Sequence, residues 1–160
     1  MKTRLPWCAG AKNGILLIDP NTDLASAYFR KAEEALEAMH SVASRDWKLS
    51  AGYYSLYFSL YAILMKAGIK SENHVCTLEI MQHVLGDYFT REECELLEQA
   101  RHARVESQYY TTSEIPAAFE DTLAHQVPRF LVKCRGIADR LDTRKIQKIR
   151  DLFTELVKQR

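Results

Sequence analysis

One stretch of the chain, residues 99–110, concentrates side chains that could bind a phosphate and a base. On a helix, positions i, i+3 and i+7 share a face, so Arg101, Arg104 and Gln108 would point the same way. Two guanidinium groups and an amide can hold phosphate oxygens, and Tyr109 just beyond them could stack on a base. The alternative is an ordinary solvated face paired with nearby glutamates, and spacing alone favours that alternative.

Other residue patterns give weaker signals. Glu37 and His40 have the Glu-x-x-His spacing of di-iron bundles, but such sites need a second pair, which the sequence lacks. His74, Cys76 and His83 match no common zinc pattern. No serine or cysteine lies in a nucleophile elbow, and there is no phosphate-binding glycine loop. The sequence therefore predicts neither a metal nor a cofactor.

Length and composition predict one globular, all-α domain over residues 1–160. The chain has 160 residues, of which 47% are hydrophobic and 27% charged, a balance typical of a single folded domain. Only 6 glycines and 4 prolines are available for turns, which is few for a β-sandwich or barrel. The central uncharged stretch, residues 51–65, is too short and too rich in tyrosine and serine to span a bilayer. We expect no membrane association.

The first ten residues contain no apolar stretch of signal-peptide length, so we expect a cytoplasmic protein. The cysteines are scattered and none forms a CxxC pair, so we expect reduced thiols. The four are Cys8, Cys76, Cys94 and Cys134.

The formal net charge of +1 hides an asymmetry along the chain. Residues 72–121 include 3 basic and 11 acidic side chains, whereas residues 129–160 include 10 basic and 4 acidic ones. Such a pattern can mark an end that binds a polyanion. It can equally reflect two solvated faces that attract each other, within the molecule or across a dimer, and we favour this second interpretation.

The candidate residues need helices to position them, and the sequence predicts an up-and-down bundle of four to five main helices. The most apolar helix, about 46–67, should be buried at the centre and end at Gly68. Its Tyr53, Tyr57 and Tyr61 form a ridge that is more typical of a core or dimer interface than of a base-stacking platform. Small residues on this helix should allow another helix to approach closely. They are Ala51, Ser55, Ser59 and Ala62.

Further helices are expected at about 21–44, 74–89, 90–110 and 113–141, with a basic C-terminal helix over 143–160. Thr90 and Glu93 have the spacing of a capping box, which should start the helix that carries the candidate site. Pro128 should kink the helix that contains it. Residues 1–20 form a short arm in which the apolar run Ile15–Ile18 could be a strand or an extended segment, and residues 21–142 form the bundle.

Three stretches together resemble HEPN domains (higher eukaryotes and prokaryotes nucleotide-binding), in a prokaryotic branch of that family. They are Gly14–Glu34, Ala51–Cys76 and Arg104–Tyr110. The resemblance implies a helical bundle, usually dimeric, found in RNA-cleaving toxins and RNA-processing enzymes that often pair with a minimal nucleotidyltransferase. The nuclease members carry Arg, four to six residues, then His. Here Tyr109 stands where that histidine would be, and neither Arg101 nor Arg104 has a histidine at the required distance.

The missing histidine favours binding over catalysis, because a tyrosine with a pKa near 10 is poorly matched to acid–base chemistry at neutral pH. We expect a non-catalytic, HEPN-like homodimer that binds a nucleotide, RNA or a partner nucleotidyltransferase, as in a toxin–antitoxin pair. Arg101, Arg104, Gln108 and Tyr109 would line its dimer cleft. Two alternatives stay open: a degenerate metal-independent ribonuclease that uses Arg104 and Tyr109, and a purely structural dimeric scaffold.

Overall fold

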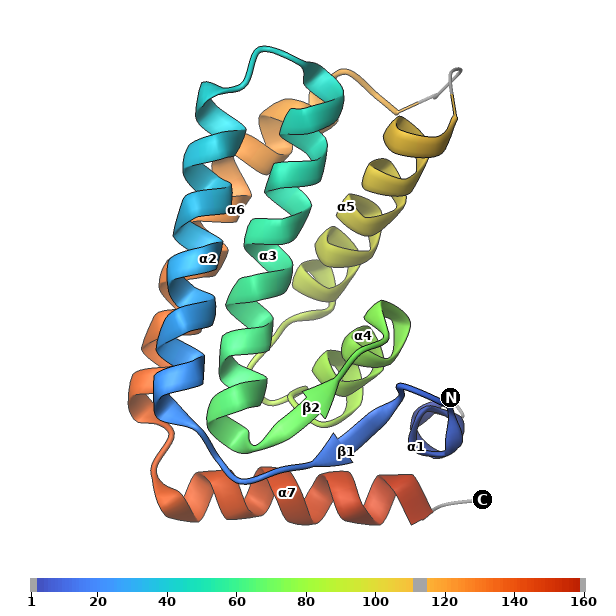
Figure 1. Ribbon diagram of the computed structural model, residues 1–160, viewed down its shortest axis with the longest axis vertical. Coiled ribbons are helices and arrows are strands. Elements are labelled where there is room, and N and C mark those ends of the chain that lie inside the picture. The colour runs from blue at the N-terminus through green and yellow to red at the C-terminus, as the bar shows by residue number, and fades with distance from the viewer. Residues whose placement is uncertain (1–2, 111–114, 159–160) are drawn as a thin grey trace.

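The computed structural model describes residues 3–110 and 115–158. Within these residues the chain forms seven helices and one two-stranded sheet, which confirms the predicted all-α bundle (Figure 1). The elements in chain order are α1 (Leu5–Gly10), β1 (Ile15–Leu17), α2 (Thr22–Ser41), α3 (Arg45–Ala67), β2 (Ile69–Ser71), α4 (His74–His83), α5 (Arg91–Tyr109), α6 (Ala118–Arg140) and α7 (Thr143–Lys158). No helix in the described ranges is both long enough and apolar enough to cross a bilayer.

Helix α3 lies at the centre of the molecule and is buried on most sides, as predicted. Helix α2 runs alongside it, and the two approach closely enough for the Ser55 hydroxyl to donate a hydrogen bond to the Ala32 carbonyl at 2.8 Å. Gly52 belongs to the same close contact, since a Cβ atom there would lie 2.9 Å from the Met39 sulfur. The small-residue strip of α3 therefore packs against a neighbouring helix, as the sequence indicated.

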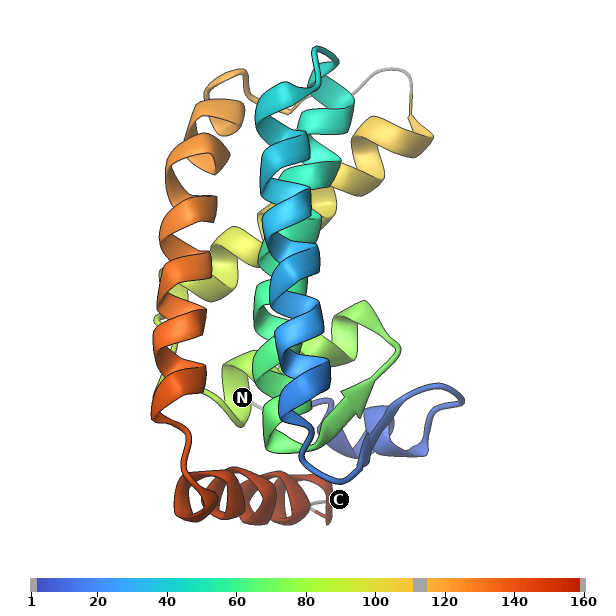
Figure 2. The ribbon, with the colours of Figure 1, turned by 60° about the vertical axis from the view of Figure 1, so that its left-hand side comes forward.

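Helices α5 and α6 complete the bundle, and α5 crosses α3 obliquely so that its C-terminal end diverges from α3 (Figures 1 and 2). The predicted capping box at Thr90 and Glu93 is present and starts α5. Helix α6 continues through Pro128. The expected start of this helix, at residues 113–114, lies outside the described residues, and so do the last two residues of the chain. Helix α4 ends at His83 rather than at the predicted residue 89.

The lower end of the bundle is closed by the sheet and by α7, which lies across it (Figures 1 and 2). Strands β1 and β2 pair antiparallel, so Ile15–Leu17 of the apolar run form a strand, the first of the two predicted alternatives. Gly68 ends α3 in the left-handed conformation, with φ of 72°. From α7, the Arg150 guanidinium Nη1 donates to the carbonyls of Ile18, Ala67 and Gly68 at 2.8, 3.1 and 2.9 Å.

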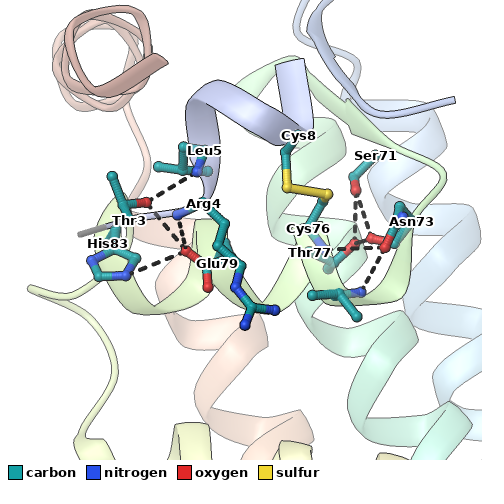
Figure 3. Close-up of a disulfide and its surroundings, with 11 residues drawn as sticks. Thr3, Arg4, Leu5, Cys8, Ser71, Asn73, Cys76, Thr77, Glu79 and His83 are labelled. Atoms are coloured by element: carbon teal, nitrogen blue, oxygen red, sulfur yellow. Dashed lines mark hydrogen bonds and ion pairs between the residues drawn. A yellow bond between two sulfur atoms is a disulfide. The ribbon is translucent and has the colours of Figure 1, made fainter. Parts of the chain in front are cut away.

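A disulfide joins Cys8 of α1 to Cys76 of α4 (Figure 3). The prediction of reduced thiols is therefore wrong for these two residues, whereas Cys94 and Cys134 are free. The N-terminal arm begins with a short helix, which the sequence analysis did not predict; this helix packs on α4 and places the two cysteine Cα atoms 5.7 Å apart. A pairing across 68 residues leaves no local spacing pattern from which it could be read.

Candidate functional site

Ala100 and Ala103, the residues before Arg101 and Arg104, are buried where α5 packs on the bundle. Helix α5 therefore directs the two arginines toward α3. Both arginine side chains are half-buried. The guanidinium carbon of Arg104 lies 5.2 Å from the centre of the Tyr54 ring on α3, a cation–π geometry. The Arg104 Nε atom is buried and has no hydrogen-bond partner among the described residues. A buried N–H donor without a partner is uncommon and is costly unless a ligand accepts from it.

Arg101 is engaged by an acid on its own helix, in agreement with the solvated-face alternative. Its Nη2 and Nε atoms donate to the two carboxylate oxygens of Glu98 at 2.7 and 3.3 Å. These hydrogen bonds raise the pKa of Arg101 further above its ordinary value. The Arg101 side chain still retains 28% of its exposure, so part of the guanidinium faces solvent.

A histidine from another helix is joined to Arg104 through two aromatic rings, although no histidine follows Arg101 or Arg104 at the nuclease spacing: His74 bonds Tyr53, whose ring centre lies 5.4 Å from that of Tyr54, the ring under Arg104. His74 is the first residue of α4, and Asn73 caps this helix by accepting from the Val75 and Cys76 amides. The His74 Nδ1 atom shares a hydrogen bond with the Tyr53 hydroxyl. Its imidazole stacks on the Tyr57 ring with 4.4 Å between ring centres. Histidine is therefore supplied by a different helix from the one that carries the arginines.

We call Tyr53, His74, Arg101 and Arg104 the Tyr–His–Arg cluster. Its electrostatics favour the neutral forms of Tyr53 and His74. Burial lowers the pKa of His74 below its ordinary value, and the charges of Arg104 and then Arg101 lower it further. Burial raises the pKa of Tyr53, and it raises that of Tyr57 to about 12. At neutral pH the cluster thus has a net positive charge that comes from the guanidiniums alone.

The other two predicted site residues lie elsewhere. The Gln108 amide nitrogen donates to the Ser50 hydroxyl at 2.9 Å, one helical turn beyond the arginines. The Tyr109 side chain is 70% exposed, and no hydrogen bond among the described residues links it to Arg101 or Arg104. Of the four predicted residues, the structure therefore brings two into one cluster, places the third beside it and leaves the fourth apart.

A groove of about 700 Å³ runs between α2, α3 and the C-terminal end of α5. Gln108 reaches its edge, and Tyr54, which packs under Arg104, forms part of its wall. The residues that line it are Lys31, Glu34, Ala35, Ala38, Val42, Trp47, Ser50, Ala51, Tyr54, Phe58 and Gln108. The groove is therefore mostly apolar and adjoins the Tyr–His–Arg cluster.

The weak metal-binding patterns do not assemble into sites. The sulfur of Cys76 is bonded to Cys8, and His83 lies 3.5 Å from Glu79, so His74, Cys76 and His83 do not form a common ligand set. No group of three or more potential ligands that could hold a metal ion occurs among residues 3–110 and 115–158.

Sequence reasoning missed Tyr53 and His74 as site residues, because they are joined to the arginines only by packing of α3 and α4 against α5. The available signal was the position of His74 directly after an Asn cap, at the start of a helix that follows the tight turn at Gly68. Chemically, the cluster offers guanidinium donors, which suit a phosphate group, whereas the buried Tyr53 hydroxyl is already hydrogen-bonded to His74. No protein-family profile matches this chain, and no curated protein matches it either.

Proposed function

We propose that this protein is a cytoplasmic, HEPN-like protein that binds a nucleotide or RNA through the phosphate group. The site is the Tyr–His–Arg cluster, in which Arg104 and Arg101 hold the phosphate. The observation that carries the proposal is the buried Arg104 Nε atom without a hydrogen-bond partner, next to a histidine whose pKa is lowered. A phosphate oxygen would accept from this donor and pair with the guanidinium charge.

The geometry supports a bound anion rather than a purely structural role for Arg104. A structural arginine in a half-buried position normally has its donors paired with carbonyls or carboxylates. Arg104 instead lies on the face of an aromatic ring, and its buried Nε atom has no hydrogen-bond partner among the described residues. Binding an anion would also favour the protonated form of His74, which the neighbouring arginines disfavour in the free protein.

The resemblance to HEPN domains adds two partners to the proposal. The protein would act as a homodimer and would pair with a minimal nucleotidyltransferase, as in a toxin–antitoxin system. We propose that Gln108 and Tyr109 lie toward the dimer cleft and contribute to the ligand or partner contact from there. The exposed position of Tyr109, at the end of α5, leaves its ring free for such a contact.

Binding of nucleoside 5′-monophosphates, triphosphates and short RNA, measured by calorimetry, tests this proposal. Arg104→Ala should weaken binding roughly 10- to 100-fold, the effect of one lost charge-assisted hydrogen bond. Arg91→Ala is the matched control, since Arg91 lies on the same helix with its side chain 86% exposed and should leave affinity unchanged. If the wild-type protein binds none of these ligands, or if both variants behave alike, the proposal is wrong.

A second candidate function, a metal-independent ribonuclease, is favoured by one observation: His74 bonds Tyr53, whose ring packs on Tyr54, the ring over which Arg104 lies. Tyr109 is 70% exposed and makes no hydrogen bond to Arg104 among the described residues, so His74 replaces it as the candidate acid–base residue. His74 would take the proton from a 2′-hydroxyl that attacks phosphorus, and the 5′-oxygen would leave to give a 2′,3′-cyclic phosphate. Arg104 would stabilise the charge that develops on phosphorus.

Cleavage of labelled RNA in EDTA separates the two candidates. An active ribonuclease should lose cleavage in His74→Gln and in Arg104→Ala, while His102→Gln, at an exposed histidine of α5, should keep full activity. Intact RNA at high protein concentration would remove the ribonuclease candidate and leave binding as the function.

A further inference from the structure

The disulfide between Cys8 and Cys76 is unusual for the cytoplasmic protein proposed above. Thiol reductants keep most cytoplasmic cysteines reduced, and the disulfides that do form there are usually transient and redox-sensing. A chain of 160 residues also buries enough apolar surface to fold without a covalent staple. A regulatory role therefore accounts for the bond better than a need for extra stability does.

Helix α1 has little besides this bond to hold it on α4. It has six residues, of which Leu5 and Cys8 are buried, and a helix of that length is not stable by itself in water. Its hydrogen bonds to α4 end on one acid: the Glu79 carboxylate accepts from the Thr3 hydroxyl at 3.2 Å and from the Arg4 amide at 2.8 Å (Figure 3). Without the disulfide, α1 would leave this position.

The first turn of α4 connects the disulfide to the Tyr–His–Arg cluster. Cys76 follows His74 by two residues, and the His74 Nδ1 atom shares a hydrogen bond with the Tyr53 hydroxyl of α3. Thr77, the next residue, donates to the hydroxyl of Ser71 at the end of β2 at 2.9 Å (Figure 3). The turn is thus fixed by a covalent bond to α1 on one side and by hydrogen bonds to α3 and β2 on the other.

We propose that the Cys8–Cys76 disulfide is a redox switch, whose reduction by a dithiol protein releases α1 and loosens the turn of α4 that positions His74. This inference rests on the proposed function for its cytoplasmic setting, and it adds a mode of regulation to that function.

The reaction is thiol–disulfide exchange in two steps. A thiolate of the reductant attacks one sulfur of the pair and forms a mixed disulfide, while the other cysteine leaves as a thiolate and takes up a proton. The second thiol of the reductant then displaces the remaining cysteine and closes the reductant's own disulfide. Two electrons and two protons thus pass to Cys8 and Cys76, and the dithiol is oxidised.

Access to the bond depends on α1, because both cysteines are fully buried. The N-terminal part of this helix buries only Leu5 besides the cysteine, so its undocking uncovers the disulfide while the core of the bundle stays packed. The other two cysteines are poor competitors in the exchange. Burial raises the pKa of Cys94 and of Cys134, which keeps both as unreactive thiols.

Equilibration with thioredoxin, followed on the Trp47→Phe variant, tests the inference. The chain has two tryptophans, so this variant keeps only Trp7 of α1. The fluorescence anisotropy of Trp7 should fall on reduction, because α1 is released. The equilibrium constant for exchange should lie within about 50-fold of one, which corresponds to the range of cytoplasmic redox poise. Adding Cys94→Ser, at a free thiol, is the matched control and should change neither value.

The NMR signals of the histidine rings give a second readout, and they need no nucleotide. On reduction, the signals of His74 should shift toward those of His102, whose side chain is 65% exposed. His125, exposed on α6, should keep its signals. Replacing Cys8 and Cys76 together by serine should give the reduced pattern with or without oxidant.

Three results would overturn the inference. A disulfide that excess reduced thioredoxin leaves intact is a structural staple. Reduction that alters neither the Trp7 anisotropy nor the His74 signals would mean that the bond controls nothing in this part of the fold. Loss of the helical circular dichroism signal on reduction would mean that the bond holds the whole fold. Because none of these measurements includes a ligand, Arg104-dependent nucleotide binding tests the proposed function separately.

Discussion

Two half-buried arginines contact α3 at different points along its length, and their surroundings differ in one decisive respect. Arg150, at the C-terminal end of α3, donates through Nη1 to three backbone carbonyls. Arg104, near Tyr54, lies over an aromatic ring and has a buried Nε without a partner among the described residues. Arg150 thus completes the fold, whereas Arg104 has a buried donor for which we propose a phosphate partner.

The contrast extends to the regions around the two arginines. At the base, the Glu79 carboxylate accepts from the Arg4 amide at 2.8 Å and a disulfide joins α1 to α4 (Figure 3). Beside Arg104, the pKa of His74 is lowered and aromatic rings are exposed in a groove. Paired polar groups and a covalent bond support stability, whereas a buried donor without a partner beside exposed rings is where function is expected.

The largest loss of stability should come from removing the disulfide between α1 and α4, at the lower end of the bundle. Replacing Cys8 and Cys76 together by serine should lower the free energy of unfolding by about 4 kcal/mol, because the bond closes a long loop in the unfolded chain. Urea denaturation measures the change, and Cys94→Ser, at a free half-buried thiol, is the control. If the double variant is as stable as the wild type, the lower end of the bundle is not the region that stabilises the protein.

Arg150→Ala should have the next largest effect, a loss of about 2–3 kcal/mol in the free energy of unfolding. The substitution leaves carbonyls at the end of α3 without their donor, and hydrogen bonds to charged groups contribute about that much. Lys148→Ala, at an exposed position of α7, should change stability little. Nucleotide affinity of the folded Arg150→Ala protein should match the wild type, and a large loss of affinity would contradict the distinction between the two arginines.

Arg104→Met should behave in the opposite way. A methionine keeps apolar contact with the Tyr54 ring and removes a buried donor that has no partner, so stability should stay within about 1 kcal/mol of the wild type or rise. Nucleotide binding should be lost because the guanidinium is gone. Thermal unfolding and calorimetry on the same preparation measure both properties, and a clear loss of stability would mean that Arg104, like Arg150, is structural.

The smallest effect should be the pH dependence that His74 contributes. Its pKa is lowered in the folded protein by burial and by the charges of Arg104 and Arg101, so the unfolded chain takes up the proton first as pH falls. The stability that depends on neutral His74 is therefore present above the ordinary histidine pKa, near 6.5, and is lost as pH falls through the lower folded value. Unfolding in urea between pH 8 and pH 5 should show this slope, which His74→Gln should reduce.

Ligand binding should move the His74 pKa in the other direction. A phosphate anion beside the arginines offsets their charge, so the pKa of His74 should rise when nucleotide binds and affinity should increase as pH is lowered. An NMR titration of the imidazole with and without ligand measures the change. An unaltered titration curve would place the phosphate away from the Tyr–His–Arg cluster.

The features that sequence predicted correctly are those that depend on local spacing. Thr90 and Glu93 form the capping box, Gly68 ends the central helix, and Ser55 lies where α2 approaches. The residues that sequence missed depend on how distant segments pack. His74 is 30 positions from Arg104 in the chain, and Cys8 is 68 positions from Cys76, so neither association leaves a periodic signal. The HEPN resemblance, the dimer and the ligand stay predictions.

The disulfide also determines how the chain would carry mechanical load. A pulling force applied between the two ends of the protein passes from Cys8 directly to Cys76 through the sulfur–sulfur bond. The segment between them, which contains α2, α3 and both strands, is bypassed and carries no tension. Helices α5, α6 and α7 would extend under force, while the central helix that bears Tyr53 and Tyr54 would remain in a covalent ring whose contour cannot lengthen.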